Sequence, residues 1–136
     1  MSTKMSFKVT AKRENEHGTL IKCKEALLVA DTDLKGRADA FNPAELLMSA
    51  LAACIIKGIE RVTPILNFEL QGVEVDISGI RQDVPPKMES IQYTIKVTSQ
   101  ESDHRLALLH ENVRKYGTVF NTLMPGTQLN GSLVRA

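Results

Sequence analysis

Aromatic residues are scarce in this sequence. They make up 4% of the 136 residues and include no tryptophan, whereas 43% of the residues are hydrophobic. The core must therefore be filled by aliphatic side chains and methionine. Such a core is thin for a chain of this length, and apolar surface shared with a second copy would add to it. The length fits one domain, and we expect residues 1–136 to form it.

An excess of charge of one sign is also absent. Seventeen basic and 16 acidic residues give a net charge of +1, so nucleic acid and anionic lipid are not expected as partners. The longest apolar stretch, residues 46–56, is too short to span a bilayer, and the N-terminal residues lack the apolar segment of a signal peptide. The only cysteines are Cys23 and Cys54. Reduced thiols in the cytoplasm are the simplest prediction.

Signals for metals and cofactors are missing as well. The eight glycines are isolated, so there is no glycine-rich phosphate loop. The histidines do not follow the spacing of a zinc site; they are His17, His104 and His110. We expect neither a metal nor a cofactor.

Strands are indicated by two-residue alternation and by β-branched residues. A polar turn over residues 12–18 separates the first two, and tandem prolines predict a long connection over residues 81–90 that cannot be strand interior. The predicted strands cover residues 5–11, 19–30, 73–78, 91–98 and 128–134.

The strongest helix signal begins at Asn42. Asn42 is a natural N-cap, Pro43 suits the first helical position, and Glu45 stands where the carboxylate of a capping box reaches back to the Asn42 amide. Residues 46–56 are apolar on nearly every side, which is typical of a buried helix. Pro64 should prevent the helix from continuing.

A second helix follows the cap candidates Ser102 and Asp103, and Gly117 ends it as a C′ glycine would. A short helical turn should cover residues 118–124. The strands come in adjacent pairs rather than alternating singly with helices. This order favours an α+β fold with antiparallel sheets around a central buried helix.

The segment FNPAELLMSALAACIIKGIERV, residues 41–62, resembles the OsmC superfamily, which includes the organic hydroperoxide resistance (Ohr) proteins. The match is an Asn-Pro opening, an acidic residue, a run of Ala and Leu, and a cysteine twelve residues after the Asn. The later HENVRKYGTVFNTL resembles the second helical segment of that family. The resemblance covers essentially the whole chain. It implies an intertwined homodimer with active sites at the subunit interface.

In the peroxidases of this family, a reactive cysteine on the central helix attacks an organic hydroperoxide, and a second cysteine resolves the product as a disulfide. An Arg and a Glu tune the first thiol, and a dithiol reductant or lipoyl-bearing protein restores it. By its position in the motif, Cys54 corresponds to the reactive cysteine.

The sequence differs from this family pattern at three points. The second cysteine would fall at about Gly117, so a disulfide within that site is excluded. The activating Glu would follow Pro43 directly, where the chain has Ala44 and then Glu45. The Arg belongs to the connection between the first strands. Two candidates for it are Arg13, in that region, and Arg37, just before the helix.

Further pocket candidates come from the second helix. His110 and Arg114 are four residues apart and share a face; with Tyr116 and Gly117 they could line a pocket beside Cys54. The alternative is that this face is simply solvated. Cys23 is either a bystander or a distant resolving thiol.

Two functions remain open at this point. A peroxidase needs a thiolate, and therefore a cation or donor near a cysteine whose sequence neighbours are apolar. The first hypothesis is a one-cysteine thiol-dependent peroxidase in which Cys54 reduces organic hydroperoxides and an external thiol reduces Cys54. The second is a non-catalytic dimeric binding module that holds a small hydrophobic ligand in the interface pocket.

Overall fold

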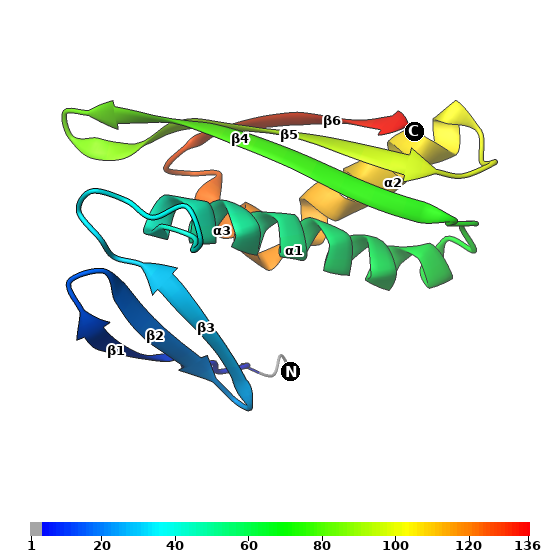
Figure 1. Cartoon of the computed structure of the whole chain (residues 1–136). Coiled ribbons are helices and arrows are strands. Elements are labelled where there is room, and N and C mark those ends of the chain that lie inside the picture. Colours follow the sequence, from blue (N-terminus) through cyan, green and yellow to red (C-terminus); the bar gives the residue numbers. More distant parts are fainter. Residues whose placement is uncertain (1–3) are drawn as a thin grey trace. The chain divides into compact units, whose positions relative to one another are not determined.

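The computed structural model describes residues 4–136, which form two compact units. The first ends at Leu46, and the second spans Leu47–Ala136. Helix α1 (Pro43–Ile65) begins in the first unit and continues into the second. The elements are labelled in Figure 1.

The first unit is an antiparallel sheet of β1 (Thr10–Asn15), β2 (Gly18–Cys23) and β3 (Ala26–Asp31), in that order. The single strand predicted over residues 19–30 is wrong, because the chain turns at Lys24, whose φ of 55° is left-handed. The prediction of a turn over residues 12–18 is also wrong for most of its length. All six residues of β1 are exposed. A strand without a buried face needs no alternation of apolar and polar residues, and the sequence of β1, TAKREN, has none.

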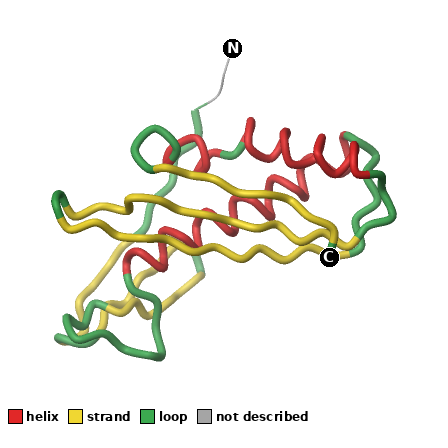
Figure 2. Tube along the Cα trace, turned by 90° about the horizontal axis from the view of Figure 1, so that it is seen from above, coloured by secondary structure: helices red, strands yellow, loops and turns green. Residues whose placement is uncertain are grey.

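The second unit contains a sheet in the order β4 (Gly72–Asp83), β5 (Pro86–Thr98) and β6 (Gln128–Arg135). β4 and β5 are antiparallel, as predicted, but β5 and β6 are parallel. The parallel pair arises because α2 (Asp103–Tyr116) and α3 (Thr118–Leu123) return the chain to the start of β5. The helices cover one face of this sheet (Figures 1 and 2).

The β4–β5 connection is much shorter than predicted. Strand pairing extends to Asp83 and resumes at Pro86, so Val84 and Pro85, joined by a cis peptide, form the turn. Prolines are tolerated here because they stand at the end of the hairpin, where no ladder hydrogen bond is needed from them.

The predicted start of α1 is confirmed. The Asn42 backbone N–H donates to Glu45 Oε1 at 2.9 Å, and the Glu45 N–H donates to Asn42 Oδ1 at 2.8 Å. This reciprocal pair satisfies two amides that the first turn cannot use. The helix ends at Ile65, with Pro64 in its last turn.

Gly117 separates α2 from α3. α2 has the predicted N-cap, Ser102, whose side chain accepts from the Arg105 amide at 3.3 Å. Gly117 itself is not the left-handed C′ glycine that the sequence suggested, because its φ of −77° and ψ of 120° are extended. It ends α2 and begins α3 in one residue.

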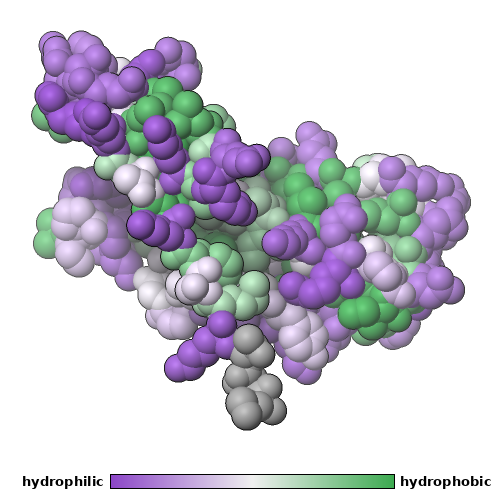
Figure 3. Space-filling view, turned by 90° about the horizontal axis from the view of Figure 1, so that it is seen from below, coloured by the Kyte–Doolittle hydropathy of each residue, from purple (hydrophilic) through white to green (hydrophobic). Residues whose placement is uncertain are grey.

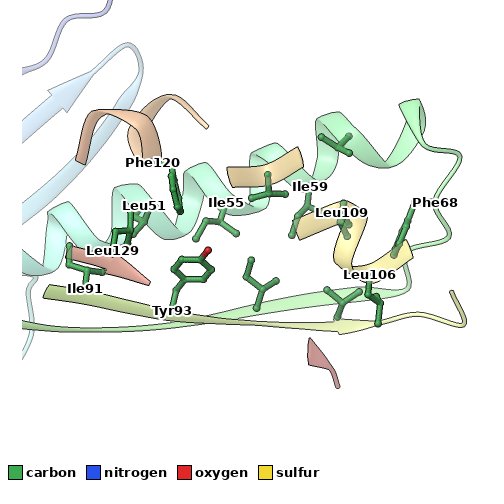
Figure 4. Close-up of a cluster of buried hydrophobic side chains, with 14 residues drawn as sticks. Leu51, Ile55, Ile59, Phe68, Ile91, Tyr93, Leu106, Leu109, Phe120 and Leu129 are labelled. Carbon is green, nitrogen blue, oxygen red and sulfur yellow. The ribbon is translucent and has the colours of Figure 1, made fainter. Parts of the chain in front are cut away.

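The core of the second unit lies between its helices and its sheet (Figure 4). Leu51, Ile55 and Ile59 recur at four-residue spacing on α1 and are almost completely buried. They pack with residues of β5, α2 and α3. Among these is Tyr93, whose ring lies against Gly131 of β6, where any Cβ would come within 2.4 Å of it.

No helix among residues 4–136 combines the length and the apolarity that crossing a bilayer requires.

Candidate functional site

Cys54 lies on α1 beside the buried stripe formed by Leu51, Ile55 and Ile59. Successive helical residues are rotated by about 100°, so a cysteine next to the fully buried Ile55 stands at the margin of the core. Its side chain is half-buried and is not in a disulfide. Cys54 is therefore a free thiol at the edge of the packed interior.

The Cys54 sulfur faces the junction between α2 and α3. A Cβ at Gly117 would lie 3.3 Å from Sγ, 3.1 Å from the Phe120 Cβ and 3.2 Å from the Val113 carbonyl oxygen. Helix and junction thus approach so closely that a side chain at Gly117 would need its neighbours to shift. The structure brings together Cys54 and Gly117, the position where the sequence lacks a second cysteine.

Arg61 is a residue that the sequence reasoning missed. It follows Cys54 and Gly58 on α1, and its Nη2 donates to the Tyr116 carbonyl oxygen at 3.3 Å. Nη2 is also 3.7 Å from the point where a Cβ on Gly58 would stand. The sequence signal was the spacing of Cys54, Gly58 and Arg61, which puts them on one helical face.

His110 and Arg114 contact a different group of residues. His110 Nε2 and Tyr93 Oη are hydrogen-bonded at 2.7 Å, and the Arg114 guanidinium lies 5.6 Å from the centre of the Phe120 ring. Burial raises the pKa of Tyr93. Burial, and then the Arg114 charge, lower the pKa of His110. The pair is therefore held in its neutral form.

The other predicted site residues lie in the first unit. Arg37 donates to both carboxylate oxygens of Asp39, at 2.8 and 2.9 Å, and to the His17 carbonyl oxygen at 3.2 Å. The hydrogen bond from Arg37 also lowers the pKa of Asp39. Arg13 is exposed on β1, and Glu45 closes the capping box. The hydrogen bonds of Arg37 to Asp39 and His17, and those of the capping box, lie within the first unit.

The remaining candidate residues are Tyr116 and Cys23. Tyr116 is exposed, with the Lys115 ammonium 5.4 Å from its ring centre. Cys23 is a free, half-buried thiol at the end of β2. Within residues 4–136, no group of three or more His, Cys, Asp or Glu side chains is arranged to hold a metal ion.

The neutral His110 makes stability depend on pH. Its pKa in the folded state is below the ordinary 6.5, so the unfolded chain binds more protons, and the free energy of unfolding should fall as the pH drops below about 6.5. We expect His110→Gln to lose less stability than the wild type between pH 7.5 and pH 5.5, in urea unfolding. His104→Gln, at an exposed position of α2, should keep the wild-type slope. Equal slopes for all three proteins would contradict the prediction.

The distance between Cys54 and Gly117 predicts an engineered disulfide. Across a disulfide, a Cβ and the opposite sulfur are about 3 Å apart, since the S–S bond is about 2.04 Å. In a Cys23→Ser background, Gly117→Cys should therefore bond to Cys54 on mild oxidation, with loss of both remaining thiols in a thiol titration. The loop closure should add up to about 4 kcal/mol to the free energy of unfolding, less the packing cost. Gly117→Ser places a side chain of similar size at the junction but cannot form a disulfide. Its free energy of unfolding therefore measures the packing cost. Free thiols in oxidised Cys23→Ser/Gly117→Cys would refute the geometry.

Similarity to known proteins supports the fold. No curated protein matches the sequence significantly. An OsmC-like protein from Mycoplasma pneumoniae has a similar structure, with a TM-score of 0.86 and 20% identity, over 97% of this chain and 99% of that one. OsmC, an organic hydroperoxide resistance protein of Legionella pneumophila, gives 0.73 and 16%, over 98% and 99%. OhrB, the organic hydroperoxide resistance protein of Bacillus subtilis, gives 0.64 and 20%, over 95% and 98%.

The family model described as OsmC-like protein matches residues 36–131. This range contains the capping box, Cys54, Arg61 and Gly117, together with the whole of α1, α2 and α3. The α+β architecture agrees with that of the solved relatives. The chain therefore belongs to the OsmC-like protein family.

Proposed function

We propose that this protein is a one-cysteine thiol-dependent peroxidase that reduces organic hydroperoxides through Cys54. The observation that carries the proposal is the position of the Cys54 sulfur, half-buried and free, against the α2–α3 junction at Gly117. Two of the similar structures belong to proteins named for organic hydroperoxide resistance. The fold and the thiol together support peroxide chemistry at this position.

The reaction follows from thiolate chemistry. The Cys54 thiolate attacks one peroxide oxygen, the O–O bond breaks, and the alkoxide takes up a proton and leaves as an alcohol. Cys54 is then a sulfenic acid. One external thiol condenses with it, releasing water and forming a mixed disulfide. A second external thiol attacks that disulfide and returns Cys54 to the reduced state.

Gly117 explains why the reductant must come from outside the site. With no side chain there, the sulfenic acid has no thiol at the junction with which to form a disulfide. The proposed substrate is a small hydrophobic peroxide, the proposed reductant is an external thiol, and no cofactor is required. The cytoplasm supplies such thiols and keeps cysteines reduced, so we place the protein there.

A homodimer completes the proposal, with residues 1–136 as one domain of each subunit. The first unit has large apolar side chains at its surface, more than its three-stranded sheet can bury alone. Figure 3 shows hydrophobic residues at the surface between hydrophilic ones. The most exposed of those in the first unit are Phe7 81%, Met5 77%, Val9 65%, Leu27 60%, Leu28 43% and Val29 40%, apart from Leu34 and Phe41 in the loop before α1.

The peroxidase proposal predicts which sulfur is oxidised. With one equivalent of cumene hydroperoxide, Cys54 should gain one oxygen atom, trapped by dimedone and located by mass spectrometry. Dithiothreitol should then restore the thiol and sustain turnover. Cys23→Ser should behave as the wild type does, while Cys54→Ser should consume no peroxide. An unmodified Cys54 would exclude the peroxidase. If wild type and Cys54→Ala then retained an apolar probe equally, the non-catalytic binding module would be favoured.

The dimer proposal predicts a solution mass twice the chain mass of 15.0 kDa by light scattering. Leu27 and Val29 lie two residues apart on β3 and share a face of the sheet. Leu27→Glu/Val29→Glu should weaken association, because it places two carboxylates on apolar contact surface. Lys12→Glu, at an exposed position of β1, should leave the mass unchanged. A wild-type mass of a single chain would rule out the dimer.

A further inference from the structure

We propose that a groove at the C-terminal end of α1 binds an alkylammonium group, which combines a cationic N–H donor with a short apolar chain. The groove lies within the second unit, where the chain turns from α1 to β4 (Figure 1), and has a volume of about 590 Å³. This volume suits a small ligand. The half-buried Leu70 and Val73 give the groove an apolar side. Cys54 does not line it, so the proposal stands apart from peroxide chemistry.

The other side of the groove is polar. Glu60 and Thr63 lie three residues apart on one face of α1, and Asn67 follows in the connection to β4. Glu60 and Asn67 are exposed, and within residues 4–136 neither side chain has a hydrogen bond or an ion pair. Their oxygens are therefore available to a ligand that donates hydrogen bonds.

The Thr63 hydroxyl is the group that points most directly to a ligand. Thr63 is only 9% exposed, yet within residues 4–136 its side chain makes no hydrogen bond. No side-chain oxygen or nitrogen of these residues is enclosed without a partner. The hydroxyl must therefore open into the groove that Thr63 lines. A largely buried hydroxyl costs free energy unless it is hydrogen-bonded, and a ligand that donates to it offsets this cost.

Pro64 adds a backbone acceptor at the same place. In an α-helix the N–H of residue 64 would donate to the carbonyl oxygen of residue 60, but proline has no N–H. The carbonyl of Glu60 therefore lacks its i→i+4 hydrogen bond, one turn before the end of α1. The carboxylate of Glu60, its carbonyl and the Thr63 hydroxyl are three acceptors. An ammonium group has three N–H donors and no acceptor.

The charges at the groove favour a cation. Among the described residues that line it, Glu60 is the only charged one. The last turn of α1 contains no basic residue, so nothing in that turn offsets the partial negative charge of the helix end. Arg105 donates to the Leu66 carbonyl at 2.6 Å. Its charge is balanced by Glu101, whose Oε1 accepts from Arg105 Nε at 2.8 Å.

The test titrates the full-length protein with n-butylamine, which is protonated at pH 7, and follows the backbone amide signals by NMR. The amine should shift the signals of Thr63, Asn67 and Gly72 saturably. n-Butanol has the same chain without the charge and should bind about fivefold more weakly. Glu60→Gln should weaken binding of n-butylamine about fivefold, and Thr63→Val about threefold. Glu111→Gln removes an exposed carboxylate of α2 that does not line the groove, and it should keep the wild-type affinity.

Three results would overturn the proposal. The first is no saturable shift of the groove signals with n-butylamine. The second is equal affinity for n-butanol, which would show that the charge is not recognised. The third is wild-type affinity in both Glu60→Gln and Thr63→Val, which would place the amine elsewhere. The signals distant from the groove show whether each variant is folded.

A second titration separates two sources of the same chemistry. Nα-acetyl-lysine methylamide carries an alkylammonium group on a peptide backbone. Binding as tight as that of n-butylamine would identify a lysine side chain as a ligand that the groove accepts. Binding about fivefold weaker would identify a free amine, because the peptide part would then clash with the walls of the groove. Either result requires the ammonium group that the groove is proposed to recognise.

Discussion

The packing of α1 onto β5 determines the arrangement of the second unit. Leu51, Ile55 and Ile59 are removed from water almost completely, and burial of each such side chain contributes roughly 1.5–3 kcal/mol. Their burial fixes the rotation of α1 about its axis. Once Ile55 faces the sheet, Cys54 must face the margin, where the α2–α3 junction lies. The position of Cys54 thus follows from the packing of an aliphatic helix face on an aliphatic sheet.

Two glycines, Gly117 and Gly58, lie close to Cys54 at the edge of the core. At Gly117, the absence of a side chain lets the junction lie against sulfur and denies the thiol an internal partner. At Gly58, by contrast, a Cβ would make only ordinary contacts, the nearest 3.7 Å from Arg61 Nη2. Bulk at Gly117 is excluded by close approach rather than by backbone conformation, since its φ is −77°. The missing side chain at Gly117 keeps the Cys54 sulfur within contact distance of the α2–α3 junction.

Features that depend on neighbouring residues could be predicted from the sequence, whereas features that depend on distant contacts could not. Asn42, Pro43 and Glu45 define a helix start within four residues, and the family resemblance follows from the same segment. The exposed β1 carries no hydrophobic alternation, so this strand could not be predicted from the sequence pattern. The left-handed turn at Lys24 breaks a run that otherwise suits one strand. The hydrogen bond of Arg61 joins it to a carbonyl fifty-five residues away, and no spacing rule reports that contact.

The parallel pairing of β5 and β6 joins two strands that α2 and α3 separate in the sequence. The residues between Thr98 and Gln128 must be traversed before the last strand can join its neighbour, and closing so long a connection costs entropy that α2 and α3 reduce by shortening the span. Formation of those helices therefore makes the pairing of β6 with β5 less costly. Until that pairing forms, one edge of β5 is unpaired and can accept a strand from another chain. Pairing with β6 closes that edge of β5 against such association.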